Sequence, residues 1–185
     1  MCKRCVNRRA NLLSWESTSY NLKYRRPLRC LAARKTISMQ MNAPLEHLTT
    51  EEFEKLKRNA LEARQRSYSP YSKFRVGCCI MLKSKECILG ANVENASYGG
   101  AICAERTAVV KAVTSGARDN WLCLAISGDS LESCISPCGI CRQVIREFAD
   151  LKMPIVMFNG DGSKHVIKTL QDLLPLSFGP EDLAD

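Results

Sequence analysis

Apolar residues recur at helical spacing in some segments of residues 49–183 and form short continuous runs in others. The first helical segment begins at Thr49, a suitable N-cap, and Glu52 completes a capping box three residues later. We predict a helix from Thr49 to about Ser67, ended by the turn-forming residues 69–72.

The rest of this region alternates between two kinds of segment. Continuous apolar runs predict buried strands at 74–82, 86–93, 121–127 and 154–158. Helical spacing predicts further helices at 104–113 and 139–148. Strands that alternate with helices favour an α/β layer fold with a largely parallel or mixed sheet.

The net charge of +8 on the 185 residues is unevenly distributed. Residues 1–42 hold ten basic side chains and one acidic one, whereas residues 43–185 hold 17 and 18. We therefore predict a basic extension without a packed fold at 1–42 and a nearly neutral domain at 43–185. A domain without a basic stripe is a poor candidate for binding nucleic acid, and no apolar run of about 18 residues predicts a membrane span.

Three interpretations of residues 1–42 remain open. The segment is rich in Arg and Ser and poor in acids, which is typical of a mitochondrial transit peptide. It is otherwise a leader that precedes a true start at Met39 or Met41, or a basic interaction tail. Because it lacks the apolar stretch of a secretory signal, we expect a cytoplasmic protein that could also enter the nucleus, or a mitochondrial one if the segment targets it.

Eight cysteines lie in residues 43–185, and without a secretory signal they do not predict disulfides. Five lie mostly among apolar residues, and we interpret them as small core side chains: Cys78, Cys79, Cys87, Cys123 and Cys134. The other three, Cys103, Cys138 and Cys141, lie at the starts of two predicted helices, where the helix dipole stabilises thiolates. Three sulfurs predict a catalytic zinc site whose fourth position is open to water.

Glu105 follows Cys103 by two residues and can lean over such a metal without binding it. A carboxylate there suits a general acid and base acting on water. The combined pattern C-A-E…P-C-x-x-C is the signature of the zinc deaminases in its three-cysteine form. The two histidines, His47 and His165, are distant in sequence from these helices, and we expect both on the surface.

From about residue 51 to 183 the sequence resembles the cytidine deaminases, specifically their small homotetrameric three-cysteine zinc type. Five segments carry the resemblance, in the family's order: 67–77 (SYSPYSKFRVG), 90–98 (GANVENASY), 102–108 (ICAERTA), 136–143 (SPCGICRQ) and 173–180 (LLPLSFGP). The resemblance implies a three-layer α/β/α fold with a mixed five-stranded sheet between the helices.

The same resemblance implies roles for individual residues. Cys103, Cys138 and Cys141 would bind one Zn²⁺ per subunit, Glu105 would shuttle protons, and Arg106 would hydrogen-bond the ligand sulfurs. The remaining matched positions would contact the substrate. Asn92 and Glu94 would bind the ribose 3′-hydroxyl, and Phe74 and the Ala104 backbone would line the nucleoside pocket. Tyr98 and Phe178 would reach into the site of a neighbouring subunit. Arg142 is a second candidate beside the sulfurs, although we favour its interpretation as an exposed helix residue.

The activity implied is zinc-dependent hydrolytic deamination of cytidine and 2′-deoxycytidine to the uridines with release of ammonia, a reaction of pyrimidine salvage. The partners implied are a small nucleoside and further copies of the chain, with no nucleic acid and no membrane. Alternatives are a polynucleotide cytosine deaminase, a blasticidin-type nucleoside deaminase, or a structural zinc module without activity. Residue types alone do not rank cytidine against 2′-deoxycytidine.

Overall fold

The structure is a computed structural model that describes residue 45 and residues 48–184. The predicted extension at 1–42 and the prediction for His47 lie outside the described residues, so the boundary between extension and domain stays a prediction. No helix in the described part of the chain is long and apolar enough to cross a membrane.

Five strands form one mixed sheet in the described residues, in the order β2-β1-β3-β4-β5. β3 and β4 pair in parallel, whereas the other three pairs are antiparallel. The strands are β1 (Val76–Leu82), β2 (Cys87–Ala91), β3 (Trp121–Gly128), β4 (Pro154–Phe158) and β5 (His165–Thr169). The predicted mixed five-stranded sheet is confirmed.

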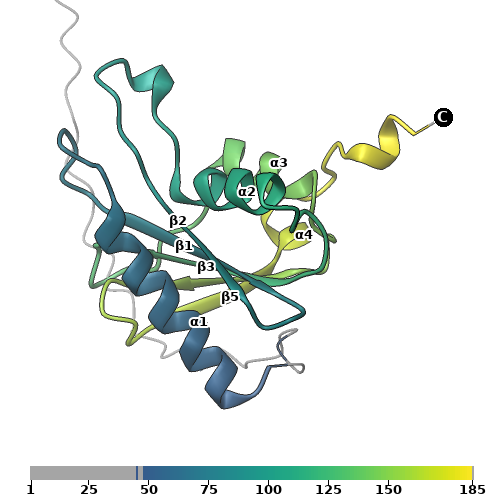
Figure 1. Ribbon diagram of the computed structural model, residues 1–185, viewed down its shortest axis with the longest axis horizontal. Helices are drawn as coiled ribbons and strands as arrows, with labels where there is room; N and C mark the ends of the chain where they lie inside the picture. The colour runs from purple at the N-terminus through teal and green to yellow at the C-terminus, as the bar shows by residue number, and fades with distance from the viewer. Residues whose placement is uncertain (1–44, 46–47, 185) are drawn as a thin grey trace, which may run out of the picture. The chain divides into compact units, whose positions relative to one another are not determined.

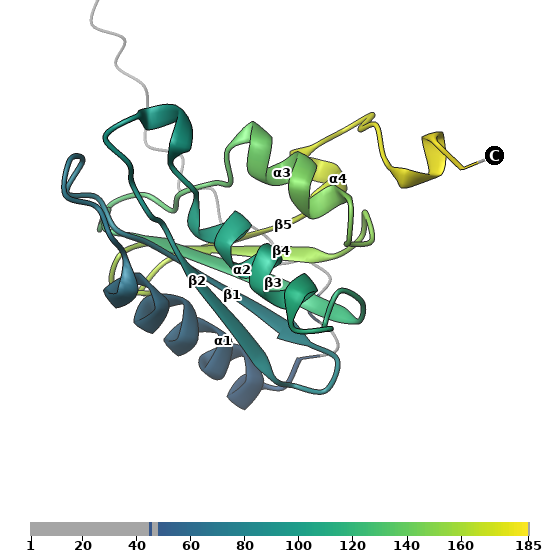
Figure 2. The same ribbon diagram turned by 45° about the horizontal axis from the view of Figure 1, so that its top comes forward.

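Helices cover both faces of this sheet. They are α1 (Thr50–Ala63), α2 (Ala104–Thr114), α3 (Gly139–Arg146) and α4 (Leu170–Leu173), with short 3₁₀ turns η1 (Arg64–Arg66), η2 (Tyr98–Gly100) and η3 (Pro180–Asp182). Among the helices of the described residues, α1 covers one face, while α2 and α3 lie side by side on the other (Figures 1 and 2). The three-layer α/β/α architecture implied by the resemblance is therefore confirmed.

The central strands read as continuous apolar runs because each of their two faces packs against helices. Along β1, Cys78 and Ile80 belong to the core under α2, whereas Cys79 and Met81 belong to the core under α1. Cys123 is likewise fully buried. The core prediction therefore holds for these three cysteines, but Cys87 and Cys134 are only half-buried.

Two glycines allow helices to approach the sheet closely. A Cβ on Gly90 would overlap the backbone of Ala104 and Ala108 in α2, and one on Gly77 would overlap the backbone at the end of α1. Since α2 begins at Ala104, directly after Cys103, the contact at Gly90 fixes the height of that helix start above the sheet.

The bounds predicted for the strands and for the second and third helices differ from the observed bounds by at most two residues, and larger differences occur at the first helix and at the C-terminal end of the sheet. The first helix has the predicted capping box at Thr49 but ends at Ala63, and one 3₁₀ turn follows it. β5 and α4 were not predicted from the spacing of apolar residues. β5 is an edge strand whose residues are at most half-buried, so its sequence lacks the apolar run that marks the inner strands.

Candidate active site

Three cysteine sulfurs converge from two helix N-termini. Cys103 is the N-cap residue of α2 and Cys138 the N-cap residue of α3, with Cys141 in the first turn of α3. The Cys103 and Cys138 sulfurs are 3.9 Å apart, and those of Cys138 and Cys141 are 3.4 Å apart. Within the described residues this is the one group of three or more Cys, His, Asp or Glu side chains whose donor atoms all lie within 4.8 Å of one another.

The donor set fits zinc. Sulfurs that each lie about 2.3 Å from a tetrahedral zinc would be about 3.8 Å from one another, close to the two separations above. The pKa of the Cys103 thiol is lowered to about 5, first by its hydrogen bond with Cys141 and then, against partial burial, by Arg106 and Cys138. A thiol that loses its proton easily is ready to bind a metal.

Glu105 lies beside the sulfurs in the first turn of α2 and is only 4% exposed. Burial raises the pKa of its carboxyl, and the nearby Cys103 charge raises it further. A carboxyl group whose pKa is raised towards neutral pH can both accept and donate a proton there, which is what a general acid and base requires.

Arg106 bridges the start of α2 and the sulfurs. Its Nη2 donates to the Ala101 carbonyl at 3.0 Å and to the Cys103 sulfur at 3.8 Å. Its Nε is buried and has no hydrogen-bond partner among the described residues. The guanidinium therefore places positive charge next to the Cys103 sulfur.

Arg142 has a different role from either of the two considered for it. Its guanidinium donates to the Pro137 carbonyl at 2.8 Å, the Leu173 carbonyl at 2.7 Å and the Ser136 hydroxyl at 2.9 Å. The interpretation as an exposed helix residue is wrong, because these bonds leave it half-buried. Arg142 ties the loop before Cys138 to the end of α4.

Asn92 and Glu94 follow β2 and face the loop at residues 67–74. Asn92 Oδ1 accepts from the Val76 N–H at 2.8 Å and from the Ser67 hydroxyl at 2.5 Å. Its Nδ2 donates to the Phe74 carbonyl at 3.0 Å, which leaves one N–H of that amide for a ligand. The amide therefore holds this loop in place.

Glu94 caps the same loop. Its Oε2 accepts from the backbone N–H of Tyr71 at 2.9 Å and of Ser72 at 3.2 Å, and its Oε1 accepts from the Ser72 hydroxyl. These bonds, the Ser72 hydroxyl first, lower the pKa of the Glu94 carboxyl and keep it ionised at neutral pH. The sequence did not single out Ser72, although a serine two residues before Phe74 is a common way to hold a turn.

Phe74 lies two residues before β1, with its ring against Gly128 at the end of β3 and close to Ile135. Its N–H donates to the Ser72 hydroxyl at 3.0 Å. Ala104, by contrast, is fully buried at the start of α2, so its backbone is its only means of meeting a ligand.

Tyr98 and Phe178 are not brought into the interior. Tyr98 is 75% exposed in η2, where its ring meets that of Tyr71 edge-on, and Phe178 is 58% exposed. Phe178 belongs to a C-terminal segment that extends away from α3 and α4 in Figure 1, and its carbonyl accepts from Gln143 Nε2 at 3.0 Å. His165, expected on the surface, is half-buried and packs edge-on against Phe53.

The sequence pattern of the family described as "Cytidine and deoxycytidylate deaminase zinc-binding region" matches residues 50–157, which include all three cysteines and Glu105. The chain belongs to the cytidine deaminase family. A cytidine deaminase of Halalkalibacterium halodurans is 41% identical over 128 residues, covering 69% of this chain and 95% of the relative. That of Sporosarcina psychrophila is 42% identical over 133 residues, covering 72% and 96%.

The fold agrees with membership in the cytidine deaminase family. A crystal structure of a cytidine deaminase from Burkholderia pseudomallei superposes with a TM-score of 0.65 at 36% identity, covering 71% of this chain and 100% of that one. A zinc-binding region in the family and the three converging sulfurs of this chain agree with one another.

Proposed function

We propose that this protein catalyses the hydrolytic deamination of cytidine and 2′-deoxycytidine, releasing ammonia and the corresponding uridine. The predicted enzyme class, a cytidine deaminase, is confirmed by membership in the family. The observation that carries the chemistry is the buried carboxyl of Glu105 beside three sulfurs at two helix N-termini.

Cys103, Cys138 and Cys141 would hold one Zn²⁺ per subunit. When bound, the ion would lower the pKa of a water molecule at its open position and so supply a nucleophile at neutral pH. Three thiolates and Zn²⁺ sum to a charge of −1, which opposes that effect. Arg106 and the positive ends of α2 and α3 offset part of the negative charge.

Glu105 moves the protons. In its ionised form it accepts a proton from water and delivers it to N3 of the cytosine ring, which makes C4 more electrophilic. The oxygen of that water bonds to C4, and Glu105 then carries the remaining proton of this oxygen to the exocyclic amine. The C4–N bond breaks, ammonia leaves and a carbonyl group remains at C4 of the uridine. Burial raises the pKa of Glu105, which helps the carboxylate to take up each proton before it delivers it.

Asn92 and Glu94 would bind the ribose 3′-hydroxyl, with the free N–H of Asn92 as donor and the Glu94 carboxylate as acceptor. The hydrogen bonds that already orient both side chains support this role, since a pre-oriented site loses little entropy on binding. An anionic Glu94 near the sugar disfavours a substrate that carries a neighbouring phosphate. It thereby favours a free nucleoside over a polynucleotide.

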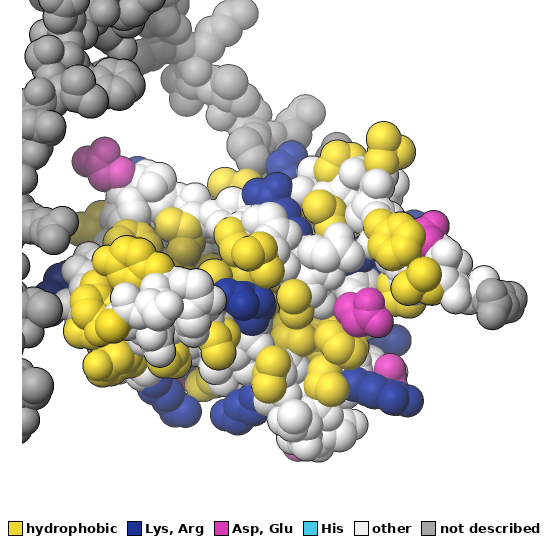
Figure 3. Space-filling view, turned by 90° about the horizontal axis from the view of Figure 1, so that it is seen from above, with side chains coloured by type: hydrophobic (Ala, Val, Ile, Leu, Met, Phe, Trp, Pro, Cys, Tyr) yellow, Lys and Arg dark blue, Asp and Glu magenta, His cyan; other side chains and the backbone are white. Residues whose placement is uncertain are grey.

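The site would be completed by neighbouring subunits of a homotetramer, with Tyr98 and Phe178 reaching across. The described surface supports this proposal, because large apolar side chains lie exposed around η2 and along the C-terminal segment. Figure 3 looks onto the face with α2 and α3, where apolar side chains gather towards both ends. The exposed large apolar side chains in and near these two segments include Tyr71, Val93, Tyr98, Ile102, Leu176, Phe178 and Leu183.

A substrate panel tests the function. The purified chain, and a version that starts at Met41, are incubated with cytidine, 2′-deoxycytidine, cytidine monophosphate and a cytosine-containing oligonucleotide, and loss of the cytosine absorbance is followed. We expect turnover of the two nucleosides only. Turnover of the oligonucleotide would identify a polynucleotide deaminase, and bound zinc without any turnover would identify a structural module.

The same comparison addresses the remaining proposals. Equal turnover by the Met41 version would support residues 43–185 as the catalytic domain, and sedimentation would give the oligomeric state. A role in pyrimidine salvage, in the cytoplasm or in mitochondria if residues 1–42 act as a transit peptide, stays a prediction.

A further inference from the structure

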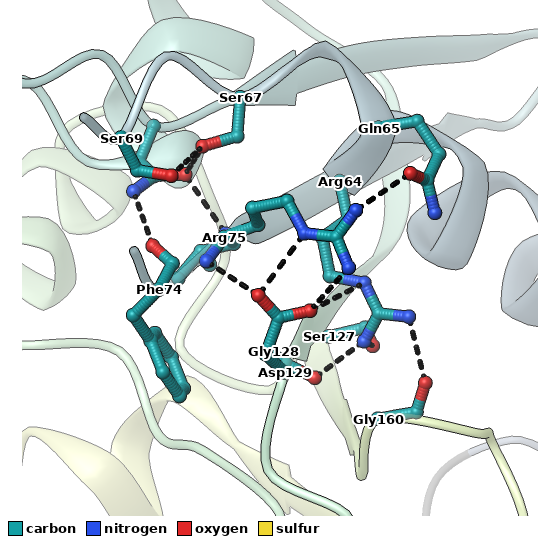
Figure 4. Close-up of polar contacts among 12 residues, drawn as sticks. Arg64, Gln65, Ser67, Ser69, Phe74, Arg75, Ser127, Gly128, Asp129 and Gly160 are labelled. Carbon is teal, nitrogen blue, oxygen red and sulfur yellow. Dashed lines mark hydrogen bonds and ion pairs between the residues drawn. The ribbon is translucent and has the colours of Figure 1, made fainter. Parts of the chain in front are cut away.

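Asp129 follows the last residue of β3 and binds the residue next to Phe74. Its Oδ2 accepts from the Arg75 backbone N–H at 2.8 Å and from Arg75 Nε at 3.1 Å, and its Oδ1 accepts from Arg75 Nη2 at 3.0 Å (Figure 4). One carboxylate thus holds both the backbone and the side chain of Arg75.

Arg64 forms an ion pair with the same carboxylate. Arg64 directly follows the last residue of α1 and is only 8% exposed, and its Nε lies 3.5 Å from Asp129 Oδ1. Its Nη1 donates to the Gly128 carbonyl at 2.5 Å and its Nη2 to the Gly160 carbonyl at 2.7 Å. Arg64 therefore anchors the ends of β3 and β4 to α1, with Asp129 between the two guanidinium groups (Figure 4).

The two backbone segments that Asp129 links, at residues 74–75 and 128–129, come into contact through the Phe74 ring. The Phe74 ring lies against Gly128, so a Cβ there would come within 3.0 Å of the ring edge. Phe74 is joined to Arg75 by one peptide bond, and Asp129 to Gly128 by another. The carboxylate of Asp129 thus ties the segment that carries the ring to the surface on which the ring rests.

We propose that Asp129, clamped by Arg75 and Arg64, is a positioning residue that sets the Phe74 ring as a wall of the nucleoside pocket. The assignment rests on the proposed function, in which Phe74 lines that pocket. It adds a residue outside the sequence segments that carry the family resemblance. Asp129 acts through Phe74, so it affects how the nucleoside is held and leaves proton transfer at Glu105 unchanged.

The charge of Asp129 suits this role. Partial burial acts to raise the pKa of its carboxyl, but the hydrogen bonds from Arg75 and the charge of Arg64 outweigh it and place the pKa below its usual value. The carboxylate therefore stays ionised over the neutral range. A neutral amide of nearly the same shape removes its charge and one of its two acceptor oxygens, which weakens the clamp without creating a cavity.

Asp129→Asn is the test, with Glu52→Gln as its matched control. Glu52 also accepts one backbone N–H, from Thr49 at 2.9 Å, and pairs with one cation, Lys85 at 3.1 Å. The two carboxylates have similar side-chain exposure, 23% for Asp129 and 21% for Glu52. Glu52 lies in the first turn of α1, whereas Arg64, which pairs with Asp129, follows the last residue of this helix. The two carboxylates are therefore associated with opposite ends of α1.

We expect Asp129→Asn to raise KM for cytidine about tenfold while kcat changes less than about twofold, because the loss is in ground-state binding. Zinc content and the pH dependence of kcat should equal those of the wild type. Glu52→Gln should lower Tm by a similar amount yet leave KM unchanged, which separates positioning from stability.

Equal KM values for Asp129→Asn and Glu52→Gln would overturn the proposal, as would a loss confined to kcat. If Asp129→Asn does not fold, Arg75→Gln replaces it, since that variant keeps the bonds of Arg64 to Gly128 and Gly160. Arg75→Gln should then raise KM, and an unchanged KM would reject the assignment. A wild-type protein that turns over neither nucleoside would overturn the proposed function, and this assignment with it.

Discussion

The guanidinium of Arg106 lies 3.8 Å from the sulfur of Cys103, three residues earlier in the chain and at the N-cap of the same helix. The same guanidinium donates to the Ala101 carbonyl, so its position is fixed by the backbone that leads into α2. A cation held in this way stabilises the thiolate of Cys103 over the thiol, and its removal has a measurable consequence.

Arg106→Gln should weaken zinc binding and activity about 10- to 100-fold at neutral pH. The Arg106 charge contributes to the lowered pKa of Cys103, so without it that pKa rises and protons compete with the metal at higher pH. The loss should therefore be larger at pH 6 than at pH 8. Zinc affinity measured across this range with a chromophoric chelator tests the sign, and Arg118→Gln, an equal charge change at a side chain 70% exposed, is the control.

Glu105→Gln should lower kcat by about 10²- to 10⁴-fold while zinc stays bound, because it removes the proton carrier and none of the three sulfurs. The variant should be at least as stable as the wild type. Burial raises the pKa of Glu105, so its ionised form costs free energy in the folded protein above that pKa, and glutamine does not carry this cost. Single-turnover kinetics, metal analysis and Tm measure the three quantities. Near-normal turnover would contradict the assignment.

Cys138→Ser should abolish stoichiometric zinc binding and activity, whereas Cys134→Ser should preserve both. The two cysteines lie four residues apart in the chain, but only Cys138 belongs to the group of converging sulfurs. Metal analysis of both purified variants tests the ligand assignment. Chelation of the wild type should abolish activity, and added zinc should restore it. Full zinc content in Cys138→Ser would exclude this cysteine as a ligand.

Glu94→Gln should reduce the preference for cytidine over 3′-deoxycytidine. A hydrogen bond between a carboxylate and a sugar hydroxyl contributes about 1.5–3 kcal/mol, or roughly 10- to 150-fold in kcat/KM. The ratio between the two substrates is the useful measurement, because loosening of the loop at Tyr71 and Ser72 affects both substrates equally. Glu86→Gln, one residue before β2, should keep the wild-type ratio. An unchanged ratio in Glu94→Gln would remove Glu94 from sugar recognition.

Gly90→Ala should destabilise the fold by about 1–3 kcal/mol, because a methyl group there overlaps the backbone of α2. The displaced helix start carries Cys103 and Glu105, so activity should fall with stability. Gly139→Ala provides the control for stability, since a Cβ at Gly139 meets no atom within 4 Å. Chemical denaturation of both variants measures the difference, and equal stabilities would show that α2 does not need this close contact.

Local patterns in the chain predict much of this protein. Inner strands such as β4 read as apolar runs because both faces of the sheet are covered, and Thr49 with Glu52 marks the start of α1. Likewise, a cysteine at each of two helix starts and a glutamate two residues after the first are recognisable without coordinates. These features depend on neighbours within one or two helical turns, so a single stretch of sequence contains them.

Other features depend on which elements the fold places together. Cys103 and Cys138 are 35 residues apart in the chain, and their sulfurs meet only because α2 and α3 lie side by side on one face of the sheet. The bonds of Arg142 to Leu173 and of Asp129 to Arg75 join segments 31 and 54 residues apart. No periodicity records such pairs, because they follow from strand order and from close approaches such as that at Gly90. The sequence alone therefore determined the reactive groups, while the tertiary structure decided which side chains hold them in place.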